Sequence, residues 1–259
     1  GIAAWDMEDK IVVSGYMKDK SASRLYIVDP QDNTYNYYEI LTADGQPFTG
    51  HCGGIAVHGV VAIIASGGCL LTFPLTQDLS DGFGYIKNTF EVPVAASFIY
   101  SDNQYLYVGE FHDGNKYVTE HYYKTKEGEH YAIILRYNLQ TFLKGDYEKM
   151  VPEVAYSIRN KVQGACFTPD GQIVLSTSYG LADTIYYVYK EEDLTYSGEA
   201  FMSAPVMFLE DCYKEVKGPA MGEDLDYYNG KVITLTESAS DKYVFGKLFF
   251  ANKVVGLEI

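Results

Sequence analysis

Short apolar runs separated by polar turns recur along the whole chain. Five of these runs open with a small residue, and each is followed, after a polar turn, by a second apolar run at a nearly constant spacing. Asp102-Asn103, Pro169–Gly171 and Asn229-Gly230 are turn sequences suited to tight hairpins. The pattern therefore predicts five β-hairpins. Their first strands are Gly1–Trp5, Gly54–His58, Ser97–Ser101, Gly164–Thr168 and Gly222–Asp226, and their second strands are Ile11–Ser14, Val60–Ala65, Tyr105–Gly109, Ile173–Ser176 and Val232–Leu235.

Further apolar runs follow the hairpins and complete a repeat of about four strands. Helical periodicity is weak everywhere except over 242–251. The predicted third strands are Arg24–Asp29, Cys69–Leu75, Tyr131–Leu139, Thr184–Lys190 and Val254–Ile259, and the predicted fourth strands are Tyr35–Leu41, Phe90–Pro93, Val154–Ile158 and Val206–Leu209. Repeats of this length are typical of β-propeller blades.

The repeat predicts an all-β chain that forms one β-propeller domain over residues 1–259, with about five four-stranded antiparallel blades. The approximate blades are 1–50, 51–94, 95–160, 161–217 and 218–259. Propellers usually close by pairing a strand from one terminus with the blade at the other. A sixth blade is the alternative, if the native chain has residues before Gly1.

One hairpin carries a family resemblance. The segment Phe167–Leu175, with the sequence Phe-Thr-Pro-Asp-Gly-Gln-Ile-Val-Leu, resembles the innermost hairpin of the TolB-like and YVTN-like bacterial propeller superfamilies. The resemblance implies a propeller fold and a bacterial source, and it says little about activity. Trp-Asp repeat endings, kelch double glycines and sialidase boxes are absent from the sequence.

Composition narrows the class of partner. The 25 tyrosines favour strands, and 20 basic against 35 acidic residues give a net charge of −15, which disfavours a nucleic-acid partner. No apolar stretch approaches the roughly 20 residues of a membrane span. The chain begins with Gly1 and shows no leader, so we expect a processed, secreted or extracytoplasmic protein.

Several groups of residues have competing interpretations. Cys52 and Cys166 are expected to be core thiols, and the tyrosine runs are expected to pack in the core, with sugar stacking as the alternative. The insertion Phe111–His130 is expected to be a solvated loop, with a metal site as the alternative. The tyrosine runs are Tyr35–Tyr38, Tyr122-Tyr123 and Tyr186–Tyr189, and the insertion carries His112, Glu120, His121, Glu129 and His130.

The propeller prediction also places a candidate site, because loops that enter first strands and loops that leave second strands share one face. Carboxylates brought together there would have raised pKa values or would bind a cation. The alternative is a structural polar lining of the channel. The predicted catalytic residues are Glu110, Glu237 and His51, and the predicted ligand-binding residues are Tyr16, Gln163, Tyr179 and Glu223.

These positions predict an extracytoplasmic propeller that binds a small molecule, a glycan or a peptide in its central funnel. The alternative is a glycan-active hydrolase or lyase that uses the funnel carboxylates. Ca²⁺ is the one cofactor that the predicted oxygen ligands suggest. The sequence contains no phosphate-binding loop, G-x-S-x-G elbow or H-E-x-x-H motif.

Overall fold

The computed structural model describes residues 1–240 and 251–259, and in this part of the chain nearly all regular structure is β-strand. All five predicted hairpins are confirmed. At the Asn229-Gly230 turn both residues have positive φ, 48° and 78°, as a tight hairpin of this type requires. The hairpins are β1(Ile2–Trp5)/β2(Lys10–Gly15), β5(Gly54–His58)/β6(Val61–Pro74), β8(Asn88–Ser101)/β9(Tyr105–Glu110), β14(Val162–Phe167)/β15(Gln172–Thr177) and β20(Gly222–Tyr228)/β21(Lys231–Thr236).

Outer strands extend these hairpins into sheets. One sheet adds β3(Arg24–Asp29), β4(Thr34–Leu41) and β7(Phe83–Tyr85) to β1 and β2; another adds β16(Thr184–Lys190) and β19(Lys214–Gly218) to β14 and β15. A third adds β22(Val255–Leu257) to β20 and β21. An eight-stranded sheet joins β5, β6, β8 and β9 to β12(Ala132–Asn138), β13(Val154–Ile158), β18(Ala204–Phe208) and β17(Thr195–Phe201).

The remaining elements are short. They are the hairpin β10(Tyr123–Thr125)/β11(Gly128–His130), the helix α1(Leu139–Leu143) and the 3₁₀ turns η1(Tyr147–Lys149), η2(Glu191–Asp193) and η3(Glu237–Ala239). The stretch 242–251, the one place where the sequence shows helical periodicity, lies outside the described residues except for Ala251. In the described part of the chain no helix is long and apolar enough to cross a membrane.

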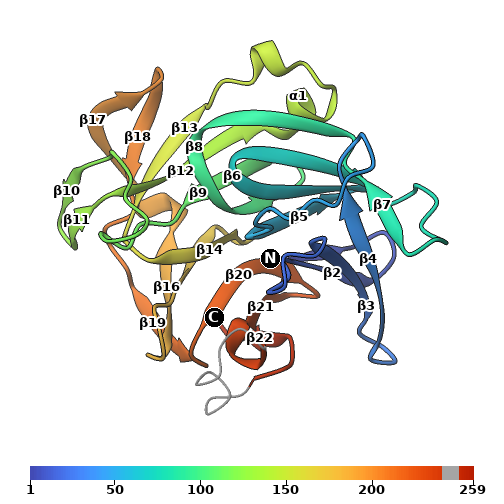
Figure 1. Ribbon diagram of the computed structural model, residues 1–259. Coiled ribbons are helices and arrows are strands. Elements are labelled where there is room, and N and C mark those ends of the chain that lie inside the picture. The colour runs from blue at the N-terminus through green and yellow to red at the C-terminus, as the bar shows by residue number, and fades with distance from the viewer. Residues whose placement is uncertain (241–250) are drawn as a thin grey trace.

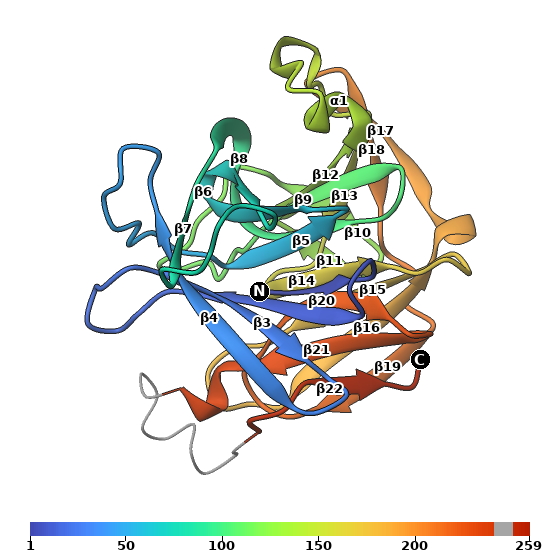
Figure 2. The ribbon, with the colours of Figure 1, turned by 90° about the vertical axis from the view of Figure 1, so that its right-hand side faces the viewer.

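The first strands of the five hairpins form a closed ring. Each contacts the next in the order β1, β5, β8, β14, β20 and back to β1. Figure 1 shows the sheets spreading outward from this centre, near which the N-terminus lies, and Figure 2 shows the ring from the side. This ring of radiating sheets places the starts of the first strands and the ends of the second strands on one face, as the sequence predicts.

One predicted turn is wrong. The chain does not turn back after Ala65, because β6 continues past a register shift between Gly67 and Cys69, where Gly67 has a positive φ of 62°. The second half of β6 then pairs with the first half of β8. The rest of β8 pairs with β9, so the blade boundary predicted between residues 94 and 95 falls inside one strand.

The run Val206–Leu209 is confirmed as part of a strand, β18, but its predicted place in the sheet is wrong. The run Val206–Leu209 was expected beside β16, but β18 instead pairs in parallel with β13 and antiparallel with β17. Val206 is fully buried against Ala155 and its neighbours, which explains this attachment. The strand beside β16 is β19, whose sequence Lys-Glu-Val-Lys-Gly is mostly polar because it lies at an exposed outer edge.

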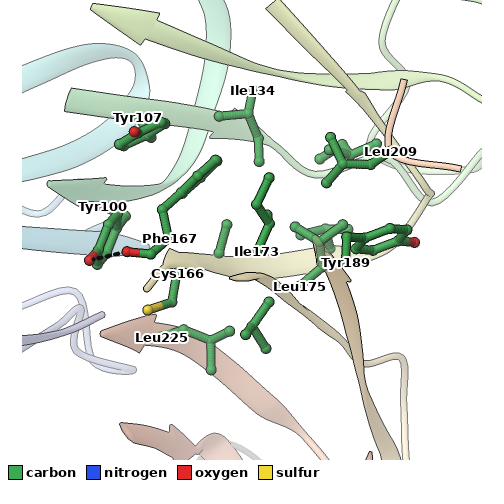
Figure 3. Close-up of a cluster of buried hydrophobic side chains, with 14 of the residues drawn as sticks. Tyr100, Tyr107, Ile134, Cys166, Phe167, Ile173, Leu175, Tyr189, Leu209 and Leu225 are labelled. Atoms are coloured by element: carbon green, nitrogen blue, oxygen red, sulfur yellow. Dashed lines mark hydrogen bonds between the residues drawn. The ribbon is translucent and has the colours of Figure 1, made fainter. Parts of the chain in front are cut away.

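Aromatic side chains fill the core between neighbouring sheets. The Phe167 ring stacks on Tyr107 with a centroid distance of 3.8 Å and packs against Tyr100 and Tyr156 (Figure 3). Cys166 is buried beside Phe167, and Cys52 is buried in a different core cluster. Both are therefore core thiols, as predicted. Burial raises the pKa of the Cys52 thiol to about 11, so this thiol is unreactive.

The tyrosine runs differ from one another. Tyr186 and Tyr189 are buried, as predicted. Tyr35 and Tyr37 are instead 61% and 47% exposed, because they lie on the outermost part of β4, where the neighbouring β7 pairs only with Glu39–Leu41. The prediction of a core role is therefore wrong for Tyr35 and Tyr37, whereas Tyr38 packs against a core cluster.

Candidate functional site

The ring of first strands is packed tightly enough to require glycine. A Cβ on Gly164 would lie 2.5 Å from the Cα of Asp224, and a Cβ on Gly54 would lie 2.5 Å from the Cα of Phe98. Both distances are far below van der Waals contact, and the clashing atoms belong to backbone. Neighbouring first strands therefore meet without intervening side chains at this level.

Two aspartates of β20 accept hydrogen bonds from the neighbouring first strands. Asp224 is fully buried, and its Oδ2 accepts hydrogen bonds from the backbone N–H groups of Ile2 at 3.4 Å and Ile55 at 3.2 Å. Asp226 Oδ2 accepts a bond from the N–H of Ala4 at 2.6 Å. Burial raises the pKa of Asp224 to about 7. These carboxyl groups act as cross-links between three first strands.

Glu223 and Glu237 form a pair of carboxyl groups at the channel mouth. Gly222 faces Thr236 in the β20/β21 pairing, and the N–H of Glu237 donates to the Met221 oxygen at 3.0 Å, so the two glutamates leave adjacent strand ends. Both side chains are half-buried. Burial, followed by the charge of Glu237, holds the pKa of Glu223 well above its ordinary value. The protonated form of Glu223 is therefore favoured beside a second carboxyl group.

Tyr16 and His51 lie together on the same face. Their ring centroids are 4.2 Å apart with the planes tilted by 37°. Tyr16 follows β2 and His51 precedes β5, and the Ser14 hydroxyl donates to the Cys52 oxygen at 3.1 Å beside them. His51 is exposed. The structure thus joins two of the predicted site residues into one exposed aromatic pair.

Glu110 does not join this group. Its carboxylate is buried, accepts hydrogen bonds from the N–H groups of Ala95 at 3.4 Å and Ile133 at 3.3 Å, and lies 3.1 Å from His121 Nε2. In the described part of the chain none of its hydrogen bonds or ion pairs reaches Glu237 or His51. The expectation that Glu110 lines an open funnel with Glu237 does not agree with these contacts.

The other two predicted residues lie around β14. Gln163 is half-buried at a β-bulge between Val162 and Gly164. Tyr179 is 50% exposed, and the Lys161 ammonium lies 4.4 Å from its ring centroid. Gln163 and Tyr179 therefore flank Lys161, a residue that the sequence analysis did not select.

The insertion between β9 and β12 is mostly exposed, as predicted for a solvated loop, but it anchors itself through a few buried side chains. His112 and His130 are 6% and 2% exposed. The β10/β11 hairpin is held by Glu127, which pairs with Arg159 and accepts a 2.7 Å bond from the N–H of Cys212. Burial lowers the pKa of His130 to about 4. In the sequence, this hairpin is indicated by the turn Lys126-Glu127-Gly128, which stands between residues that alternate between apolar and polar.

A hollow of about 450 Å³ lies where this insertion meets the start of β14. It is lined by His112, Asp113, Gly114, Val118, Thr119, Tyr131, Asn160 and Lys161. Lys161 directly precedes β14, so the rule that selected Gln163 would have found it if applied one or two residues earlier. Thr119 and Tyr131 left no comparable signal, because the insertion has no counterpart in the other hairpins.

A metal site is not supported by the described side chains. Within residues 1–240 and 251–259, no group of three or more His, Cys, Asp and Glu residues is arranged to hold a metal ion. Ca²⁺ therefore stays a prediction from the sequence without a ligand set.

Comparisons with known proteins concern the fold alone. No family model matches the chain, and no curated protein is similar to it in sequence. The PQQ-bound aldose sugar dehydrogenase of Streptomyces coelicolor aligns with 91% of this chain and 73% of its own, at 14% identity and a TM-score of 0.50. Glutaminyl cyclase of Myxococcus xanthus aligns with 91% of this chain and 84% of its own, at 8% identity and a TM-score of 0.50.

With the closed ring of radiating sheets, these similarities settle the architecture. The chain is a β-propeller. A hydrazine synthase chain of Kuenenia stuttgartiensis also aligns, at 11% identity and a TM-score of 0.43, and this propeller spans 57% of its length. That similarity is too low to carry an argument about function.

Proposed function

We propose that this propeller binds a glycan at the channel mouth, where the Glu223–Glu237 pair lies on the same face as the Tyr16–His51 pair. The carboxyl pair is the observation that carries the proposal. In its protonated form, which the raised pKa favours, Glu223 can donate a hydrogen bond, and Glu237 can accept one; sugar hydroxyls need both kinds of partner. The exposed ring of His51 beside Tyr16 offers the flat apolar surface that the face of a sugar ring requires.

The glycan class is preferred over a peptide because of the charge state of the pair. A cationic peptide would be attracted by two carboxylates, but the raised pKa of Glu223 favours the uncharged form of one of them. A neutral, hydroxyl-rich ligand makes use of the acid form. Affinity should then fall as pH rises past the raised pKa of Glu223, because the donor is lost.

The test is calorimetric titration with a panel of neutral tetrasaccharides that includes cello-, xylo-, manno- and maltotetraose. Glu237→Gln should weaken binding of the oligosaccharide that the wild type binds by about ten-fold, the effect of losing one charge-assisted hydrogen bond. Glu148→Gln is the matched control, because Glu148 is exposed and lies in η1, far along the chain from the channel strands. Absence of binding across the panel, or unchanged affinity in Glu237→Gln, would refute the proposal.

A glycan-active hydrolase is the second candidate, and the same pair favours it. Glycoside hydrolysis needs a carboxylic acid with a raised pKa and a second carboxylate that stays ionised. In this reading Glu223 protonates the leaving oxygen and Glu237 serves as base or nucleophile. Release of reducing ends from the same tetrasaccharides by the wild type, and its loss in Glu223→Gln, would establish this activity; binding without release would leave the protein a binding module.

A further inference from the structure

The hollow between the insertion and the start of β14 has the dimensions of a small-molecule site. Its volume of about 450 Å³ falls in the range of roughly 300–1,000 Å³ common for ligand pockets. Its lining combines the apolar Val118 with polar side chains of two chain segments. These segments belong to the units of the β8/β9 and β14/β15 hairpins. The Glu223–Glu237 pair belongs to the β20/β21 hairpin, so the hollow uses none of its residues.

Lys161 supplies an uncompensated positive charge at this hollow. Its backbone is fixed on both sides: the N–H donates to the His112 oxygen at 2.9 Å, and its own oxygen accepts from the Ser178 N–H at 3.2 Å. The ammonium rests over the Tyr179 ring at 4.4 Å. Among the described residues it has no carboxylate within ion-pairing distance, although the chain carries a net charge of −15.

His112 supplies an unused polar atom to the same space. Its Nδ1 is engaged by Thr119, at 3.2 Å from the backbone nitrogen and 2.8 Å from Oγ1. Its Nε2 makes no hydrogen bond within the described residues and lies 3.6 Å from where a Cβ on Gly114 would stand. His112 is 6% exposed, and its ring packs parallel to Tyr131 at 4.9 Å, so the orientation is fixed.

The one carboxylate of the lining is turned toward its own loop. Asp113 Oδ1 accepts hydrogen bonds from the N–H groups of Tyr117 at 2.8 Å and Asn115 at 2.9 Å. The amide of Asn160 is also engaged, since its Oδ1 accepts from the Tyr131 N–H at 3.1 Å. Lys161 and His112 Nε2 are therefore the groups that remain for a ligand.

We propose that this hollow binds a small, hydroxyl-rich carboxylate of the sugar-acid class, with the carboxylate on Lys161 and a hydroxyl on His112 Nε2. A single ammonium without a neighbouring arginine or a helix N-terminus suits one negative charge better than a phosphate dianion. The neutral His112 ring suits a hydroxyl, because its burial lowers its pKa and leaves Lys161 as the cation. This site does not depend on glycan binding at the channel mouth.

The experiment is calorimetric titration of the full chain with glucuronate, and with glucose as the probe that lacks the carboxylate. The wild type should bind glucuronate at least ten-fold more tightly than glucose, and Lys161→Gln should lose about ten-fold in glucuronate affinity. Lys161→Arg should retain binding because it keeps the charge. Lys144→Gln, at the exposed C-cap of α1, is the control and should bind as the wild type does.

Two further measurements keep the proposal falsifiable if a Lys161 variant does not fold. Glucuronate binding to the wild type should weaken with added salt, as an ion pair within reach of solvent requires. Glu237→Gln should leave glucuronate affinity unchanged, which separates this site from the channel mouth. Equal binding of glucose and glucuronate, or a loss of glucuronate affinity in Glu237→Gln, overturns the proposal.

Discussion

The hydroxyl of Tyr100 donates a hydrogen bond of 2.8 Å to the backbone oxygen of Phe167 (Figure 3). Tyr100 belongs to β8 and Phe167 to β14, so the bond joins the first strands of two neighbouring hairpin units. Both residues are buried. A carbonyl in this position would otherwise have no solvent to bond with, which makes the contact important for how the two units are held together.

Tyr100→Phe should lower the free energy of unfolding by about 1–3 kcal/mol, because it leaves the Phe167 oxygen buried without a partner. Tyr137→Phe is the matched control. Tyr137 is equally buried, but its hydroxyl has no hydrogen-bond partner in the described structure, so its removal should be neutral or stabilising. Urea denaturation of both variants checks the difference, and an equal cost for both would contradict the role assigned to the Tyr100 bond.

Gly164→Ala should destabilise the ring by about 1–3 kcal/mol or more, because the added methyl would meet the backbone of Asp224 at 2.5 Å. Gly68→Ala should change stability by less than about 0.5 kcal/mol, since nothing lies within 4 Å of its Cβ position. Thermal unfolding of the two variants provides the measurement. A tolerated Gly164→Ala would mean that β14 and β20 are further apart than described.

Asp224→Asn should change how stability depends on pH. The folded pKa of about 7 lies above the ordinary value of 3.8, so the folded state holds a proton that the unfolded state has released between these values. The wild-type free energy of unfolding should therefore contain a term that is present below about pH 4 and is lost as pH rises to about 7. The amide keeps acceptors for Ile2 and Ile55, so the variant should show a shallower fall over this range, while the exposed Asp183→Asn should match the wild type.

His130 should produce a pH dependence of the opposite sign. Burial depresses the folded pKa of His130 to about 4 from the ordinary 6.5. Its contribution to the free energy of unfolding is therefore complete above about pH 6.5 and is lost as pH falls toward 4. His130→Asn should remove this acid loss. Denaturation curves at pH 4.5, 5.5 and 6.5 test the difference, with His58→Asn, whose side chain is not buried, as control. An unchanged acid loss in His130→Asn would show that other groups cause it.

The hairpins were predictable because each combines turn chemistry with alternating apolar residues. Strands such as Arg24–Asp29, Val154–Ile158 and Thr184–Lys190 were predicted with the bounds that the structure has. The strand β19 was missed because an outer edge needs few apolar residues. The continuity of β6 was missed because Gly67-Gly68 is typical of a turn, whereas in the structure it lies within one continuous strand.

The candidate site was predicted only in part, and Glu110 shows why. The rule for the funnel treated Glu110 as a loop residue that leaves β9, but it is the last residue of that strand. Side chains alternate along a strand, so Glu110 shares its side of the sheet with Leu106 and Val108, which pack in the core. Period-two counting from Val108 would have placed its carboxylate in the interior.

Tyr16 and His51 were found by position alone, since the ends of second strands and the starts of first strands converge whatever the intervening sequence. His112 was considered only as part of a solvated loop or a metal site, and Lys161, whose N–H donates to the His112 oxygen, was not predicted. A prediction from the repeat therefore places the residues that every unit carries on this face, but not the contacts that one insertion adds.

The strand β8, which pairs with both β6 and β9, affects how the molecule unfolds. Its 14 residues carry backbone hydrogen bonds to β6 at one end and to β9 at the other. Neither partner strand can be released without fraying the backbone that holds the other, so the second and third units should exchange their amide hydrogens as one cooperative block. The same continuity means that a unit cannot be excised or duplicated at residues 94 and 95 without cutting a strand in two.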